Sequence, residues 1–184
     1  MIHPDIDRVL YDGETIARRV EDLALEITDD YRGKPPLIVG ILKGSFIFMA
    51  DLVRHVGLEC EIDFLAVSSY GNRSMTTGAV RVLKDLDHDI EGLDILIIED
   101  ILDSGKTLSY IMNILRSSSP ASVSVCALMD KPSRRQAPIN AQYVGFCVPD
   151  EFLVGYGMDY AGRYRNLPYI GCLKREVYMK EAIF

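Results

Sequence analysis

Short apolar segments of the chain alternate with longer amphipathic ones. Residues 37–42 (LIVGIL) and 95–98 (ILII) contain no polar side chain, which is typical of strands buried on both faces of a sheet. Residues 14–31 and about 106–115 instead repeat apolar side chains at the spacing of a helix. Strands that alternate with helices predict an α/β fold, in which a parallel twisted sheet is flanked by helices and ligands bind at the carboxyl ends of the strands.

The remaining segments fit the same scheme. A second helix is predicted from Gly44 to Val56, and Asp12 is expected to cap the first helix. The polar segment 68–78 (SSYGNRSMTTG) indicates a mobile loop. A chain of 184 residues has the usual size of a single domain. Further strands are predicted at residues 59–67, 79–83, 122–128 and 143–147.

Charge and composition exclude several classes of partner. The chain has 20 Lys and Arg against 27 Asp and Glu, a net charge of −7, so its overall field repels nucleic acid and anionic membranes. The apolar segments are far shorter than the roughly 20 residues of a membrane span, and the first residues lack the apolar core of a secretory signal. The four cysteines form no close pair, so we expect buried, reduced thiols in a cytoplasmic protein.

The most informative segment is LIIEDILDSGKT, residues 96–107. An apolar strand runs directly into Glu99 and Asp100, then Asp103, and a helix is predicted to begin near the Ser-Gly-Lys-Thr sequence. Amides at a helix start, with small hydroxyl residues and a glycine, can hold a phosphate group. The end of the segment resembles a P-loop, but the position of that motif's first glycine is Asp100. A P-loop nucleotide site or kinase is therefore excluded.

Three carboxylates ahead of an anion site need a partner other than phosphate. Sugar hydroxyls, magnesium or positive charge that develops during a reaction would each suit Glu99, Asp100 and Asp103. A phosphorylated sugar satisfies the carboxylates and the anion site together. The alternative is that the three acids only cap the next helix.

The sequence EDILDSGKT resembles the phosphoribosyl pyrophosphate loop of the type I phosphoribosyltransferases, and more narrowly that of the hypoxanthine-guanine phosphoribosyltransferases. The likeness extends over nearly the whole chain, and its last segment is the most specific part. The other matching segments are LKGSFIFMADL (42–52), SSYGNRSMTTG, DKPSRR (130–135) and VGFCVPDEFLVGYGMDYAGRYRNLPYIG (144–171).

The resemblance implies one phosphoribosyltransferase domain over residues 1–184. Its core would span about 35–150, and both chain ends, about 1–12 and 151–184, would form a small hood over the base. The implied reaction transfers ribose 5-phosphate from phosphoribosyl pyrophosphate to N9 of hypoxanthine or guanine, giving IMP or GMP and pyrophosphate. Such enzymes use Mg²⁺ and are usually homodimers or homotetramers.

Family roles carried over to matching positions define the sugar half of the site. Glu99 and Asp100 would face the ribose hydroxyls and lie near the metal, where they would stabilise developing oxocarbenium charge. Asp103 would lie beside N7 of the purine as general acid or base. The 5′-phosphate would be bound, mainly through backbone amides, by Ser104, Gly105, Lys106 and Thr107.

The resemblance also assigns the pyrophosphate and metal positions. Lys43 and Gly44 match the loop that contacts pyrophosphate, and Arg165 would clamp the same group with its planar guanidinium. Ser69 and Tyr70 match the tip of a loop that closes over the substrate and excludes water. The metal would be held by Glu99, Asp100 and Asp159.

The purine would be read by three residues. Lys131 would donate to O6 and so reject 6-amino bases, because an ammonium group cannot accept a hydrogen bond. Phe152 would stack on the base and the main chain of Leu153 would contact its edge; the alternative for Phe152 is a place in a strand core. Arg135 also matches a family arginine, but the adjacent Arg134 leaves the register open.

Two other functions compete with this interpretation. A xanthine-guanine transferase would share the sugar half of the site, and the choice of base depends on few contacts. Some relatives keep the phosphoribosyl pyrophosphate loop but regulate nucleic acids. The net charge of −7, with no basic cluster, disfavours such a regulator, as does the presence of Asp103, Lys131 and Phe152.

Overall fold

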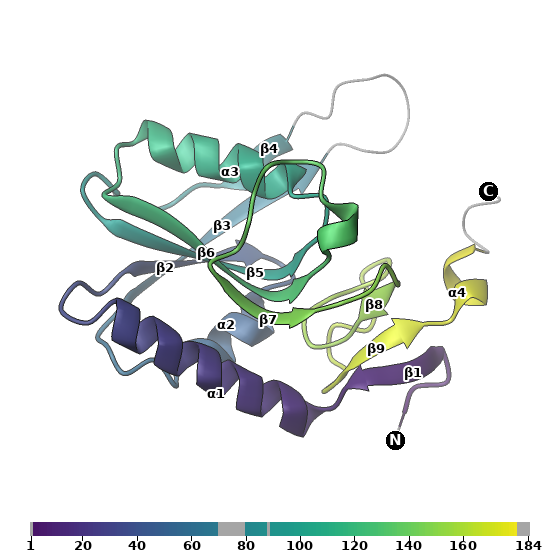
Figure 1. Ribbon diagram of the computed structural model, residues 1–184. Helices are drawn as coiled ribbons and strands as arrows, with labels where there is room; N and C mark the ends of the chain where they lie inside the picture. The colour runs from purple at the N-terminus through teal and green to yellow at the C-terminus, as the bar shows by residue number, and fades with distance from the viewer. Residues whose placement is uncertain (1, 70–79, 88, 180–184) are drawn as a thin grey trace.

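The computed structural model describes residues 2–69, 80–87 and 89–179 and contains a six-stranded sheet with helices on both faces (Figure 1). Five of the strands are parallel, and the edge strand β4 runs antiparallel to β3. The predicted α/β class is therefore confirmed, with one antiparallel strand at the edge. The strand order is β4 (Val80–Lys84), β3 (Glu61–Ser69), β2 (Leu37–Leu42), β5 (Asp94–Leu102), β6 (Ser122–Asp130) and β7 (Tyr143–Cys147).

The direction of β4 has a simple physical reason. Parallel neighbours need a crossover connection of roughly a dozen residues or more, usually a helix. Only residues 70–79 separate the end of β3 from the start of β4. A connection of this length suits an antiparallel pair, so the chain returns along the edge of the sheet.

Helices cover the two faces of the sheet unequally. Helices α1 (Gly13–Asp30) and α2 (Phe46–Val53) lie on one face and α3 (Lys106–Ser117) on the other (Figure 1). The predicted cap of α1 is present, since the Asp12 carboxylate accepts a hydrogen bond of 2.8 Å from the Thr15 amide. Helix α2 is shorter than the predicted 44–56, because residues 43–45 form a turn that joins it to β2.

A second, three-stranded antiparallel sheet lies at one end of the molecule (Figure 1). It contains β1 (Ile6–Tyr11), β9 (Ile170–Leu173) and β8 (Leu153–Val154), in that order, so segments from both ends of the chain pair within it. Helix α4 (Arg175–Met179) follows β9, and a short 3₁₀ helix, η1 (Pro132–Arg134), follows β6.

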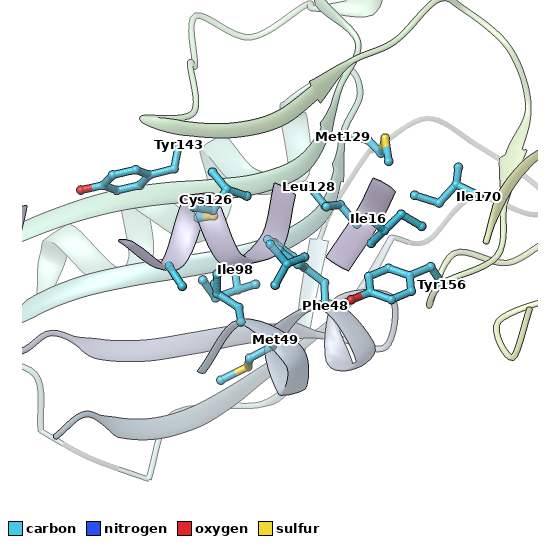
Figure 2. Close-up of a cluster of buried hydrophobic side chains, with 14 of the residues drawn as sticks. Ile16, Phe48, Met49, Ile98, Cys126, Leu128, Met129, Tyr143, Tyr156 and Ile170 are labelled. Carbon is cyan, nitrogen blue, oxygen red and sulfur yellow. The ribbon is translucent and has the colours of Figure 1, made fainter. Parts of the chain in front are cut away.

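The main core joins the two sheets. Buried side chains of α1 and α2 pack against the large sheet together with Ile170 of the smaller sheet and Tyr156 of the segment after β8 (Figure 2). A second cluster fills the space between the large sheet and α3. Because the two sheets share the first cluster, the small sheet is fixed firmly at the carboxyl ends of the parallel strands.

All four cysteines are free; Cys126 and Cys172 are buried as expected, but Cys147, at the end of the edge strand β7, is exposed. Among the residues that the structure describes, no helix combines the length and apolar character that crossing a bilayer requires.

Candidate active site

The loop between β5 and α3 contains the predicted phosphate-binding residues. Gly105 has a left-handed backbone (φ 76°) and directly precedes α3, whose first residues are Lys106 and Thr107. The first amides of a helix have no acceptor within the helix and attract anions. The carbonyl of Ser104 is held by the amides of Gln136 (2.9 Å) and Ala137 (3.1 Å). The loop is thus fixed with its helix start available to a phosphate.

Arg135 holds this loop from behind. Its guanidinium is 14% exposed and donates to the carbonyls of Leu102 (3.0 Å) and Asp103 and to the carboxylate of Asp130. A Cβ at Gly105 would approach the Arg135 side chain to 3.2 Å. The sequence left the choice between Arg134 and Arg135 open, and the structure identifies Arg135 as the arginine that supports the loop.

Glu99 and Asp100 lie within β5, near its carboxyl end and before Ile101 and Leu102, not in the loop after it. Burial raises the pKa of Glu99 well above its usual value, and the neighbouring charge of Asp100 adds to the effect. Burial likewise raises the pKa of Asp100 to about 6, although the charge of Arg165 opposes the shift. Two half-buried carboxylates on consecutive residues form a strongly electronegative point that suits a cation or a set of hydroxyl groups.

Gly44 lies directly against this acidic pair. A Cβ at Gly44 would lie 1.7 Å from Oδ2 of Asp100, so only glycine allows the turn after β2 to approach so closely. The preceding peptide bond, Leu42–Lys43, is cis. Lys43 itself is exposed. The structure therefore brings the predicted pyrophosphate turn and the predicted ribose-binding acids together.

Asp159 and Arg165 lie in the segment that connects β8 to β9 and form an ion pair of 2.6 Å. The Asp159 carboxylate also accepts from the Gly162 amide (2.7 Å), and Arg165 donates to the Gly157 carbonyl (2.6 Å). In the described part of the chain, no three acidic, histidine or cysteine side chains converge as a metal-binding group. Any Mg²⁺ here would need oxygen ligands from a substrate, which is usual for this ion.

A pocket of about 800 Å³ forms the other half of the site. Asp103 and Phe152 both line it, together with Arg134 and Tyr178. Arg134 donates to Asp103 (3.2 Å), and Phe152 is 38% exposed with its ring stacked on Tyr178 at a centroid distance of 5.1 Å. An exposed aromatic face beside a carboxylate can hold a planar heterocycle.

Lys131 is almost fully buried behind this pocket. It is 6% exposed, and its Nζ donates to the Glu151 carbonyl (2.5 Å) while its amide donates to the Leu102 carbonyl (3.0 Å). Burial lowers the pKa of Lys131. Leu153, the first residue of β8, is buried and pairs with Cys172 of β9. Lys131 therefore links the segment before Phe152 to the end of β5.

Two predicted residues lie at the limit of the structure. Ser69 is the last residue of β3, and Tyr70 lies outside the described residues. Tyr178 also lines the pocket and was not predicted, because no sequence motif marks it and it reaches the pocket only through the fold of the segment after β9.

Comparison with known proteins identifies the family to which the chain is similar. Residues 8–161 match the model of the phosphoribosyl transferase domain family. The chain is 53% identical, over 97% of its length and 99% of the relative, to the hypoxanthine-guanine phosphoribosyltransferase of Bacillus subtilis. A hypoxanthine phosphoribosyltransferase structure from Staphylococcus aureus is 50% identical, with a TM-score of 0.91 over 96% of both chains. The Trypanosoma cruzi hypoxanthine phosphoribosyl transferase structure is 36% identical, with a TM-score of 0.92 over 100% of both chains.

Proposed function

Because the chain belongs to the hypoxanthine-guanine phosphoribosyltransferase family, we propose that it acts in purine salvage by making IMP or GMP. In this reaction, N9 of hypoxanthine or guanine attacks C1′ of phosphoribosyl pyrophosphate, and pyrophosphate leaves. The substrates are thus two small molecules, and each half of the site described above would take one of them.

The phosphate loop would hold the 5′-phosphate. Gly105 and the amides at the start of α3 supply donors and a favourable helix dipole, with Ser104 and Thr107 offering hydroxyl groups. Since Arg135 fixes the loop carbonyls, the amides are oriented before the substrate arrives. Binding then costs less entropy, because the loop is already ordered before the substrate arrives.

The acidic pair would face the sugar. With a pKa of about 6, Asp100 is ionised at neutral pH, so it can accept hydrogen bonds from ribose hydroxyls and stabilise positive charge at C1′. The carboxylate oxygens of Glu99, Asp100 and Asp159 fit Mg²⁺, with substrate oxygens completing its coordination. When bound, the ion would neutralise the charge of the leaving pyrophosphate, which Arg165 and the turn at Lys43 and Gly44 would also bind.

The pocket beside Asp103 would take the purine. Phe152 would stack on the ring, Leu153 would contact its edge through the main chain, and Asp103 would exchange a proton with N7 as N9 attacks. Lys131 would donate to O6. Its amide contact with Leu102, one residue before Asp103, supports the proposal most, because it joins the base-selecting lysine to the catalytic loop.

The proposal also covers the hood, the closing loop, the location and the oligomeric state of the enzyme. The three-stranded sheet would be the hood over the base, with boundaries near residues 1–12 and 151–184 around a core of about 35–150. Ser69 and Tyr70 would belong to a loop that closes over the pyrophosphate. The enzyme would work in the cytoplasm as a homodimer or homotetramer.

A steady-state assay with phosphoribosyl pyrophosphate, Mg²⁺ and each of four purines tests the function. We expect turnover with hypoxanthine and guanine and none with adenine. If the folded protein used neither of the first two, the proposal would be rejected. Efficient use of xanthine would instead favour a xanthine-guanine transferase, since the sugar half of the site is common to both.

A further inference from the structure

The two parts of the pyrophosphate half of the site come from different sheets. Lys43 and Gly44 follow β2 of the large sheet, whereas Asp159 and Arg165 follow β8 of the small one. No strand pairing links these two segments. Their relative position therefore depends on contacts between the turn after β2, with the helix α2 that continues it, and the segment after β8.

The first contact is a close approach of two backbones. Gly157 has a left-handed backbone (φ 103°), and a Cβ at this position would lie 2.1 Å from the carbonyl oxygen of Gly44. The Gly157 amide donates to the Arg165 carbonyl (3.0 Å), and Arg165 donates back to the Gly157 carbonyl (2.6 Å). Gly157, which contacts the turn, is thus joined to Arg165 by two hydrogen bonds.

The second contact is a hydrogen bond from the neighbouring residue. Tyr156 is 8% exposed, and its hydroxyl donates to Oδ2 of Asp51 in α2 over 2.6 Å. Its own backbone is fixed by a bond of 2.9 Å from its amide to the Leu167 carbonyl. The ring packs at the edge of the main core near Phe48 of α2 (Figure 2). This bond connects α2, which begins just after Gly44, to the segment that contains Asp159 and Arg165.

We propose that Tyr156 is a positioning residue for pyrophosphate: its bond to Asp51 holds the Asp159–Arg165 segment in register with the turn at Lys43 and Gly44. Tyr156 lies outside the set of residues proposed above to touch a substrate. This inference rests on the proposed function for the identity of the ligand. It predicts that loss of the bond weakens the binding of pyrophosphate, while a ligand that occupies only the phosphate loop, ribose acids and purine pocket is unaffected.

The molecule offers a matched control. Tyr143 of β7 is also buried, and its hydroxyl donates to the Asp30 carboxylate at the end of α1 over 2.8 Å. This pair links a tyrosine to an aspartate of a helix on the same face of the sheet, but neither residue adjoins a predicted substrate-binding residue. A general effect of losing a buried tyrosine–carboxylate bond would therefore appear in both variants.

The test compares Tyr156→Phe and Tyr143→Phe in the full-length protein. Calorimetric titration would measure the affinity of magnesium pyrophosphate and, separately, of IMP, and thermal unfolding would verify that each variant is folded. We expect Tyr156→Phe to weaken pyrophosphate roughly tenfold, as for a lost hydrogen bond to a charged group, and to leave IMP binding unchanged. Tyr143→Phe should lower the melting temperature but change neither affinity.

Asp51 provides a second route to the same conclusion, which matters if Tyr156→Phe does not fold. Asp51→Ala should reproduce the loss of pyrophosphate affinity, Asp51→Asn should retain most of the affinity because its amide oxygen still accepts, and the double variant should be no worse than Asp51→Ala. Unchanged pyrophosphate affinity in Tyr156→Phe or Asp51→Ala, or an equal loss of IMP affinity, would overturn the role. A wild-type protein that makes no IMP would refute the proposed function instead, and the pyrophosphate titration would still decide the role of Tyr156.

Discussion

Asp103 already has a charged partner in the pocket. Its carboxylate is 40% exposed and forms an ion pair with Arg134 at 3.2 Å. A purine whose N7 contacts Asp103 must therefore share or replace this ion pair. We predict that Asp103→Asn keeps the affinity for phosphoribosyl pyrophosphate while transfer slows by roughly a hundredfold or more, the usual contribution of general acid–base catalysis. Steady-state kinetics at saturating substrates would measure both effects. If binding weakened and the rate at saturation held, the assigned role would be wrong.

The ionised form of Asp100, which the proposed function needs, is the form that destabilises the folded protein. Burial raises its pKa to about 6, above the value of an unfolded chain, so the folded state binds the proton more tightly. The resulting stabilisation is complete below about pH 4 and is lost as the pH rises through about 6. At neutral pH the folded protein therefore contains an ionised Asp100, although the neutral carboxylic acid would be more stable in this environment.

We predict that Asp100→Asn raises the free energy of unfolding at pH 7.5 by on the order of 3 kcal/mol, while activity falls. The amide oxygen can still accept the 2.9 Å bond from the Ile101 amide. In urea titrations the gain should shrink toward zero near pH 4, where both side chains are neutral in the folded state. Asp22→Asn, at an exposed position of α1, is the control. A gain that does not change with pH would exclude burial of the charge as its cause.

The elements that build the site differ in how far the sequence predicts them. Strand β5 and the loop after it were predictable, because an apolar run, adjacent acids and a glycine before a helix are local signals. The choice of Arg135 over Arg134 was not, because it depends on how η1 turns the chain after Pro132. The Tyr156–Asp51 bond joins residues 105 positions apart, and no local pattern reports such a pair. The prediction of a parallel sheet did not single out the antiparallel edge strand β4, although the short connection from β3 favours that direction.

The support of the phosphate loop by Arg135, which directly follows η1, gives a prediction at this scale. Arg135→Ala would leave the carbonyls of Leu102 and Asp103 and the carboxylate of Asp130 without their shared donor. We expect a loss of about 3 kcal/mol in the free energy of unfolding together with weaker IMP binding. Arg134→Ala is the matched control for stability, since its 50% exposed side chain forms only surface ion pairs, worth about 1 kcal/mol or less. Equal losses in the two variants would contradict the supporting role.

At the scale of the whole molecule, the two sheets share one core. Ile170 of β9 is fully buried in the same cluster as Ile16 of α1 and Phe48 of α2 (Figure 2). Such a shared core predicts that the small sheet does not unfold separately. Position in the sequence alone would have suggested the opposite, because the small sheet is built from the ends of the chain.

We predict that Ile170→Ala lowers the stability of the entire molecule by about 2 to 5 kcal/mol, the usual cost of such a truncation in a core. Calorimetry should still give a single transition, with the melting curve from far-ultraviolet circular dichroism coinciding with that from tyrosine absorbance. Ile62→Ala, at a position 46% exposed, should have little effect. Two separate transitions in the Ile170→Ala variant would show that the sheets unfold independently.

The strand order of the small sheet has a consequence for synthesis. Strand β9 lies between β1 and β8, so β1 cannot form its pairing in this sheet until residues 170–173 of β9 have been synthesised. A nascent chain that has emerged as far as Ala137 contains the loop before α3 and the residues that hold it, but Leu173 and Tyr178, which line the pocket next to Phe152, are still missing. Completion of the pocket thus depends on synthesis of β9 and α4, and a product truncated before them would keep the loop before α3 without the residues that close the pocket beside Phe152.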